Sequence, residues 1–183
     1  ANLYHTLRDS SQLSLKAYCY SSKRGLPGSV TFYNPISTEK LWDENYFAQA
    51  QYRKQLSRQW SLRAQATYTH GWNKLCDYGT PVDNGYYTER YGQDEFYLSA
   101  SVLFRPTQAF SVSLAQDGAS NTMESNLKEC PYPTRYTSMT ALRARYHWHG
   151  LRVDASLVHT ATWEKVKAGE APDDFNRLAP ALS

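Results

Sequence analysis

Polar and apolar residues alternate with a period of two along most of this chain. The clearest stretch is 60–72, where apolar and aromatic side chains alternate with polar ones. A period of two indicates a β-strand, because successive side chains leave opposite faces. Among the apolar and aromatic positions of this stretch, small aliphatic residues occupy the middle and aromatic residues occupy the ends. These positions are Trp60, Leu62, Ala64, Ala66, Tyr68, His70 and Trp72.

The same alternation recurs along the rest of the chain and predicts an all-β protein. It indicates seven full strands and a partial strand at each end of the chain. Consecutive strands are close enough in sequence to form long antiparallel hairpins in a meander. The full strands are expected at 12–22, 46–55, 60–72, 95–105, 110–115, 136–148 and 151–163, and the partial strands at 2–8 and 177–183.

The connections between these strands alternate between tight turns and long loops. Tight turns are expected at 9–11, 56–59, 106–108 and 149–150, and long loops at 23–42, 73–91, 118–135 and 165–176. Short turns on one side and long loops on the other are typical of outer-membrane β-barrels. Most of these strands also have ten residues or more, which is enough to cross a bilayer when tilted.

Aromatic residues collect at the two ends of the predicted strands. Amphipathic aromatic rings are favoured at the two interfaces of a membrane. The pattern therefore predicts an antiparallel transmembrane β-barrel with an aromatic girdle at each interface. The girdle beside the tight turns contains Trp60, Phe110 and Trp148, and the girdle beside the long loops contains Tyr68, Trp72 and Trp163.

A soluble β-sandwich or a lipocalin-like ligand-binding barrel is the main alternative fold, since such sheets also alternate. It would require Trp60 and Trp148 to meet in one dry core. It does not explain why aromatic residues gather at strand ends or why every second connection is long.

The polar side of the predicted strands carries many charged residues. In a barrel these side chains would line the lumen, where they either contact other parts of the protein or pair with one another inside the wall. The predicted lumen-lining residues are Arg53, Arg63, Arg143, Arg145, Arg152, Asp154 and Glu164.

Composition narrows the candidate partners. The net charge of +3 is mild and the basic residues are scattered, so no nucleic-acid partner is expected. The chain holds 15 tyrosines and five tryptophans, and many fall in the predicted long loops. Tyrosine provides amphipathic contact area at low entropic cost, which suits a ligand-capturing surface. The candidate ligand-binding residues are Trp42, Tyr86, Tyr87, Tyr91 and Tyr132.

No motif for catalysis or metal binding stands out. The histidines at 147 and 149 lie beside a tight turn, where a solvated rim is the simpler reading than a metal site. No nucleophile elbow accompanies the serines, so no enzymatic activity, metal or cofactor is expected. Cys76 and Cys130 both fall in predicted loops and could pair in an oxidising compartment.

Three segments resemble the barrel of TonB-dependent outer-membrane receptors. They are residues 18–28, which end in Leu26, Pro27 and Gly28, residues 41–47, which begin with Leu41 and Trp42, and residues 173–183. The last segment resembles the entry to a barrel strand in such receptors. The similarity extends over most of the chain.

This resemblance implies a barrel of about 22 strands, an N-terminal plug domain and a segment that binds the energy-coupling protein TonB. The sequence contains no visible plug domain, and the remaining strands are also missing. We therefore expect the 183 residues to be a single barrel segment, a fragment of roughly a third of the barrel. Two unpaired sheet edges would make such a fragment prone to self-association.

The function implied is uptake of a scarce nutrient across the outer membrane of a Gram-negative bacterium. The class takes up metal chelates, cobalamin-like cofactors or glycans as small-molecule ligands, and the chain itself would catalyse nothing. The expected partners are the lipid bilayer, the nutrient and TonB. A small outer-membrane barrel hydrolase is a further alternative, which would need a nucleophile, a histidine and an acid converging at the loop-side rim.

Overall fold

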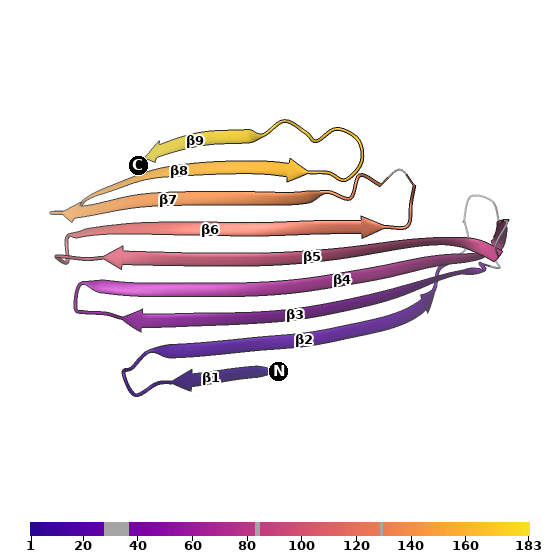
Figure 1. The fold of residues 1–183 in the computed structure, drawn as a ribbon. Helices are drawn as coiled ribbons and strands as arrows, with labels where there is room; N and C mark the ends of the chain where they lie inside the picture. The colour runs from indigo at the N-terminus through magenta and orange to yellow at the C-terminus, as the bar shows by residue number, and fades with distance from the viewer. Residues whose placement is uncertain (28–36, 83–84, 129) are drawn as a thin grey trace.

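The computed structural model describes residues 1–27, 37–82, 85–128 and 130–183. All the regular secondary structure in these residues is β-strand. Nine strands form one antiparallel sheet in which each strand pairs with its neighbours in sequence (Figure 1). The two chain ends lie on opposite edges of this meander. The strands are β1 (Asn2–Thr6), β2 (Gln12–Gly25), β3 (Glu39–Gln55), β4 (Trp60–Val82), β5 (Gly85–Phe104), β6 (Phe110–Ser125), β7 (Thr134–Trp148), β8 (Leu151–Lys165) and β9 (Phe175–Leu182).

The register brings the alternating residues of every strand onto common faces. Leu15 pairs with Ala50, Ala50 with Ala66, and Ala66 with Leu98, so one apolar row crosses four strands. We call the side of the sheet that carries this row the apolar face. The opposite side, the polar face, carries the residues between them, such as Gln65 and its partner Ser99. A shift by one residue would exchange the two faces, so the pairing follows directly from the sequence pattern.

The sheet forms a single layer without a conventional hydrophobic core. In the described part of the chain, Cys76 and Cys130 are the only apolar side chains that are buried. Leu98, Leu114 and Leu142 on the apolar face remain 49%, 50% and 45% exposed. The expected all-β antiparallel meander is confirmed. The sheet is open, with one edge at β1 and the other at β9.

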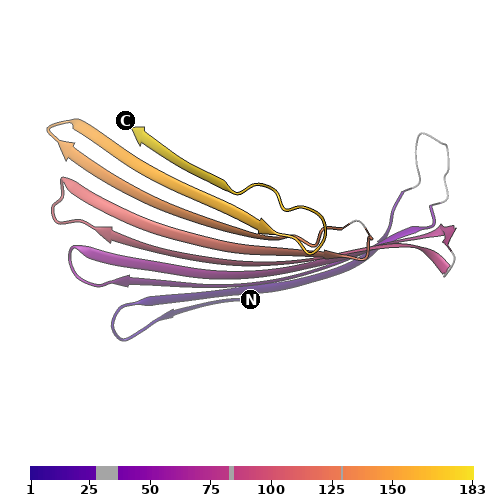
Figure 2. The same cartoon turned by 45° about the horizontal axis from the view of Figure 1, so that its top comes forward.

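Several strands continue far beyond the ends that the sequence pattern predicts. β3 begins at Glu39, β4 continues to Val82 and β5 begins at Gly85, so these strands have 17, 23 and 20 residues. Figure 2 shows their common extension projecting past the ends of β6 to β9. The prediction that 73–91 forms a long loop is therefore wrong. Neither side of this extension is uniformly apolar, so the period of two disappears from the sequence while the backbone pairing continues.

The extension also corrects the placement of four candidate ligand-binding residues. Trp42 lies in β3, and Tyr86, Tyr87 and Tyr91 lie in β5, where loops were expected. Tyr132 remains in the connection between β6 and β7. Part of the predicted loop 23–42 lies outside the described residues.

The tight turns lie where the sequence predicts them. His149 and Gly150 join β7 to β8 with φ angles of 44° and 84°. Two successive positive φ angles define the type I′ turn that suits a two-residue hairpin. The β1–β2 turn is closed by Asp9, whose carboxylate accepts hydrogen bonds from the backbone N–H and the hydroxyl of Ser11 at 3.2 and 2.6 Å. We call the end of the sheet with these turns the turn end, and the opposite end the loop end.

Candidate functional site

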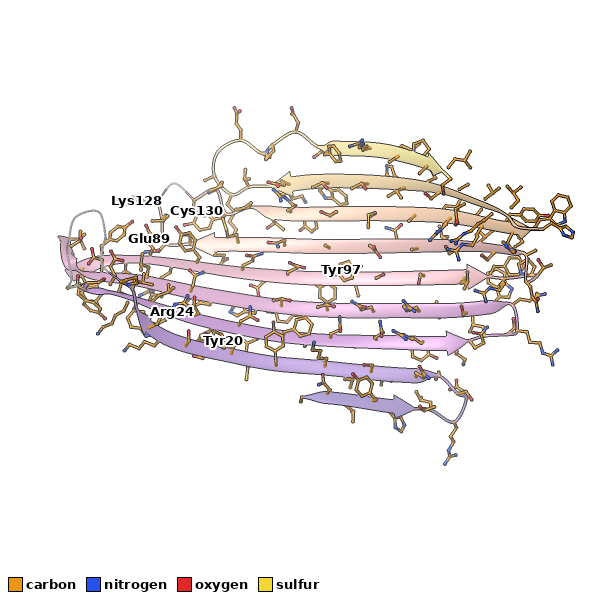
Figure 3. The ribbon with its side chains drawn as sticks, turned by 180° about the vertical axis from the view of Figure 1, so that it is seen from behind. Tyr20, Arg24, Glu89, Tyr97, Lys128 and Cys130 are labelled. Carbon is orange, nitrogen blue, oxygen red and sulfur yellow. The ribbon has the colours of Figure 1, made fainter. Side chains whose placement is uncertain are left out.

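The polar face is held together by hydrogen bonds between side chains on adjacent strands. The Gln51 amide donates to the Gln65 side chain at 3.2 Å, linking β3 to β4. The Ser99 hydroxyl donates to Asp117 at 2.6 Å, linking β5 to β6. Such cross-strand pairs stabilise a sheet. Figure 3 shows this face extending toward the loop end, with Tyr97 near the middle of β5.

Three arginines at the turn end of the polar face converge on one carboxylate. Asp154 accepts bonds from Arg143 Nη2 at 2.8 Å, from Arg145 Nε at 3.0 Å and from Arg152 Nε at 2.9 Å. The Asp154 side chain is 14% exposed, whereas the three arginines are 42–60% exposed. The cluster therefore carries two positive charges in excess of its own counter-ion. Four predicted lumen-lining residues are thus brought together on β7 and β8.

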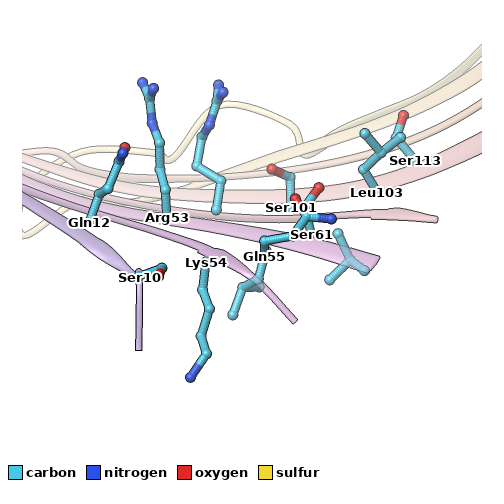
Figure 4. A pocket seen from close by; sticks show the side chains of 12 residues that line it. Ser10, Gln12, Arg53, Lys54, Gln55, Ser61, Ser101, Leu103 and Ser113 are labelled. Atoms are coloured by element: carbon cyan, nitrogen blue, oxygen red, sulfur yellow. The ribbon is translucent and has the colours of Figure 1, made fainter. Parts of the chain in front are cut away.

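A second basic group at the turn end has no such counter-ion. Arg53 and Arg63 lie directly opposite each other on β3 and β4. Arg53 bonds to Gln51 at 2.9 Å, and in the described chain neither arginine has a carboxylate within ion-pair distance. Together with Gln12 and Ser101 they line a hollow of about 380 Å³. Figure 4 shows Arg53 and Gln12 on one side of the sheet and Lys54 on the other.

The remaining predicted lumen-lining residue, Glu164, lies nearer the loop end. It accepts a hydrogen bond from Arg135 Nε across the β7–β8 pair. All seven predicted residues therefore lie on one face. They form two basic groups and one ion pair, and no single site gathers them.

The candidate ligand-binding residues are divided between the two faces of the extension. Tyr87 and Tyr91 alternate with Tyr86 on β5, so the first two share the polar face and the third lies on the opposite side. Trp42 lies on the same side as Tyr86, between Lys23 and Lys74. These aromatic residues therefore do not share one face in the described part of the chain, and their role in ligand binding stays a prediction.

Two tyrosines at the loop end have raised pKa values. The Tyr87 hydroxyl donates to Glu89, and this bond raises the pKa of the tyrosine, with burial and the charge of Glu89 adding smaller contributions. The ring of Tyr78 lies 4.4 Å from that of Tyr86. Burial and the neighbouring Tyr86 raise the pKa of Tyr78. These phenols therefore remain neutral hydrogen-bond donors at physiological pH.

The six predicted girdle residues all lie on the apolar face. Trp60 stacks on Phe104 with ring centroids 4.3 Å apart at the turn end. Trp163 stacks on Tyr136 at 5.8 Å near the loop end. The Tyr68 hydroxyl donates to Asp94 at 2.6 Å, and this carboxylate also bonds His70 Nδ1 at 2.8 Å. The other girdle residues are Trp72, Phe110 and Trp148.

The structure also places residues that the sequence analysis did not single out. Gln116 donates to the Ser138 hydroxyl at 3.0 Å and accepts from Thr140, forming a polar cluster on the apolar face of β6 and β7. Lys74 and Arg90 lie opposite each other in the β4–β5 extension. Continuing the alternation past the predicted strand ends would have identified both features.

In the described residues the cysteines are unpaired and the possible metal ligands are scattered. Cys19, Cys76 and Cys130 are free thiols, so the pair considered from the sequence is not bonded. No three metal-binding side chains come together within residues 1–27, 37–82, 85–128 and 130–183. The same residues contain no helix long and apolar enough to cross a membrane.

Comparison of the chain with models of known protein families and with curated proteins found no match.

Proposed function

We propose that this chain is part of the wall of an outer-membrane β-barrel receptor of the TonB-dependent class, which takes up a scarce nutrient. The observation that carries the proposal is the uncovered apolar face. Large apolar side chains along seven strands, β2 to β8, point away from any protein partner in the described chain. Monomeric soluble proteins rarely expose contiguous apolar patches larger than a few hundred Å². A lipid bilayer supplies the apolar surroundings that this face lacks.

The distribution of aromatic residues supports a bilayer as the partner. Trp60, Phe104 and Phe110 lie on this face at the turn end, and Tyr68 and Phe96 lie eight residues further along their strands. A transmembrane strand needs about 9–11 residues, which matches this separation. The residues between the two belts are mostly alanine, leucine and valine.

The open edges support a wall segment that continues into further strands. The outer edges of β1 and β9 have no partner strand in the described chain, and every residue of these two strands is exposed. In a bilayer each unpaired backbone group would cost several kcal/mol, so a barrel has to close. The neighbouring strands would come from the rest of the receptor or, for the isolated chain, from another copy.

The soluble alternative fits the described residues less well. A sandwich would bury the apolar face against a second sheet, and Trp60 and Trp148 would share its core. Trp148 is 58% exposed and contacts His149, while Trp60 stacks on Phe104. A barrel hydrolase would need a nucleophile beside the pair His70 and Asp94, and the hydroxyl that bonds this carboxylate belongs to Tyr68.

Deleting the gene that encodes this chain tests the proposed uptake. The deletion strain should lose growth on one scarce nutrient, such as a metal chelate or a cobalamin-like cofactor, and regain growth when the gene is restored. Removing TonB should produce the same defect. Unchanged growth on every scarce nutrient, or a defect that persists after the gene is restored, would contradict the proposal.

A further inference from the structure

A row of three cations and one tryptophan crosses four strands at the loop end of the apolar face. Lys23 pairs in register with Trp42, Trp42 with Lys74, and Lys74 with Arg90. We call these four residues the cation row. Their register partners continue the same alternation that places Ala48 and Tyr68 on this face. The row therefore points to the same side as the girdle residues.

Trp42 lies between two ammonium groups of this row. Lys23 Nζ is 4.9 Å and Lys74 Nζ is 5.4 Å from the centre of a Trp42 ring. A cation attracts the negative face of an aromatic ring, so both lysines are held near the indole. This contact orients the two ammonium groups but does not neutralise their positive charges.

The cation row has no carboxylate to neutralise it within the described chain. None of Lys23, Lys74 and Arg90 lies within 4.0 Å of an acidic oxygen there, whereas Arg24 on the polar face pairs with Asp43 at 3.0 Å. Like charges directly opposite each other, such as Lys74 and Arg90, destabilise a strand pair. An anion bound between them would remove this repulsion.

The acidic residues nearest to the row on this face are already engaged. Glu44 accepts a hydrogen bond from the Tyr46 hydroxyl at 3.2 Å. Glu124 lies 3.7 Å from Lys167. Neither carboxylate lies within 4.0 Å of a cation of the row, so the row is open to an anion from outside the described chain.

The position of the row along the strands indicates which anion it would bind. Lys74 and its partner Trp42 lie two residues beyond Trp72, the girdle residue furthest along β4. Two residues extend about 7 Å along a strand, less when the strand is tilted. The aromatic belt sits at the level of the polar headgroups, which form a layer about 5–7 Å thick on each side of the bilayer. On the proposed receptor, the row would thus face the headgroups of the surrounding lipid.

We propose that the cation row binds the phosphate of a membrane lipid headgroup. The ammonium and guanidinium groups would bond the phosphate oxygens, and the Trp42 indole would pack beside the glycerol or sugar backbone of the lipid. Arginine and lysine are the usual phosphate ligands in proteins. This inference rests on the proposed membrane location and adds a specific lipid site to it.

Titration of the protein in neutral detergent with phosphatidate, followed by native mass spectrometry, tests the site. Replacing three cations (K23Q, K74Q and R90Q) should weaken phosphatidate binding by about a hundredfold, because each cation near an anionic lipid contributes about fivefold. A double variant, K23Q with R90Q, changes only exposed side chains and should weaken binding by about 25-fold. Circular dichroism would verify that each variant keeps its β-structure.

A charge-matched variant on the polar face provides the control. Replacing Lys16, Arg53 and Arg63 by Gln removes the same charge from the opposite side of the sheet. Phosphatidate binding should then change less than twofold. An equal loss in both triple variants would mean attraction by net charge alone and would overturn the proposal. Phosphatidylcholine binding as tight as phosphatidate binding would also overturn it.

Further measurements distinguish a failure of this inference from a failure of the proposed function. Inorganic phosphate should not displace phosphatidate, and displacement at comparable concentrations would mean that the row takes free phosphate, which contradicts a lipid site. A protein that binds detergent but shows no preference for phosphatidate would overturn this inference alone. A protein that remains a monomer in plain buffer without detergent would overturn the proposed function as well.

Discussion

The two faces of this sheet contain similar numbers of side chains, but they differ in how far the chain provides these side chains with partners. On the polar face, side chains bond one another, as in the bonds from Gln51 to Gln65 and from Ser99 to Asp117. On the apolar face, side chains such as Leu98 and Leu114 remain about half exposed. The polar face therefore satisfies many of its uncharged side chains by itself but keeps excess positive charge, whereas the apolar face requires a partner that the described residues do not provide.

Several polar side chains on the apolar face are paired with each other by hydrogen bonds. Gln116 bonds both Ser138 and Thr140, and His159 Nε2 lies 2.8 Å from the Asn176 side-chain oxygen. Polar groups in apolar surroundings are costly unless they are paired. Their mutual bonding makes the cluster compatible with a lipid-facing position.

The largest expected effect on stability comes from placing an arginine on the apolar face. Leu98→Arg should destabilise the protein folded in lipid vesicles by about 2–4 kcal/mol, because the guanidinium would enter the hydrocarbon layer. Ser99→Arg is the matched control, since it faces the other way and lies beside Asp117. Its expected effect is below about 1 kcal/mol. Urea unfolding in phosphatidylcholine vesicles measures both, and equal effects would erase the distinction between the faces.

A smaller effect is expected at the turn that keeps β7 and β8 in register. Gly150 has a φ of 84°, so Gly150→Ala should cost about 1–2 kcal/mol. Gly118→Ala is the control, because Gly118 lies within β6 and an added Cβ would meet nothing within 4 Å. The same unfolding experiment should detect no loss for Gly118→Ala. Equal losses would mean that the turn does not set the register of the two faces.

Removing the counter-ion of the arginine cluster tests how self-contained the polar face is. Asp154→Asn leaves Arg143, Arg145 and Arg152 without their carboxylate. The loss of stability should be smaller than that of Gly150→Ala, because the arginines are 42–60% exposed, and it should shrink as salt is added. Unfolding at low and high salt measures the difference, with Asp174→Asn in the β8–β9 connection as the control. A loss that is independent of salt would contradict an electrostatic role.

The smallest effect concerns the β1–β2 turn. Hydrogen bonding to Lys54, and then to Ser11, holds the pKa of Asp9 well below its ordinary value of 3.8. A depressed pKa means that Asp9 stabilises the fold above pH 3.8, and that this contribution disappears as the pH falls through the lowered pKa. Titration of the Asp9 carboxyl carbon followed by NMR should give a midpoint below 3.8, and Lys54→Gln should move it upward. A midpoint at or above 3.8 would contradict the turn contacts.

The sequence predicted the fold where one face of the sheet is apolar. In 60–72 the alternation identified both the strand and the face of each residue, and the tight turn at 149–150 followed from His149 and Gly150. It failed in the extension of β4 and β5. There both faces carry polar and charged groups, so backbone pairing alone maintains the strands and leaves no periodic signal.

The candidate site was predictable only as sets of residues that share a face. Alternation assigned Arg143, Arg145 and Asp154 to one side, but their convergence depends on the register of β7 and β8. Tyr86, Tyr87 and Tyr91 fall in a predicted loop because Gly79 and Pro81 interrupt the alternation in 73–91. The structure accommodates this interruption by a register shift between Asp77 and Pro81. Pairing between distant segments is therefore the information that the sequence pattern lacked.

Photo-crosslinking in living cells tests most directly whether the apolar face contacts lipid. A benzophenone amino acid would replace Leu114 or, in the matched variant, its neighbour Ala115 on the polar face. Our account predicts lipid adducts at position 114 and none at position 115, detected by mass spectrometry of the protein isolated from the outer membrane. Adducts to lipid at both positions, or to protein alone at position 114, would contradict the assignment of this face to the bilayer.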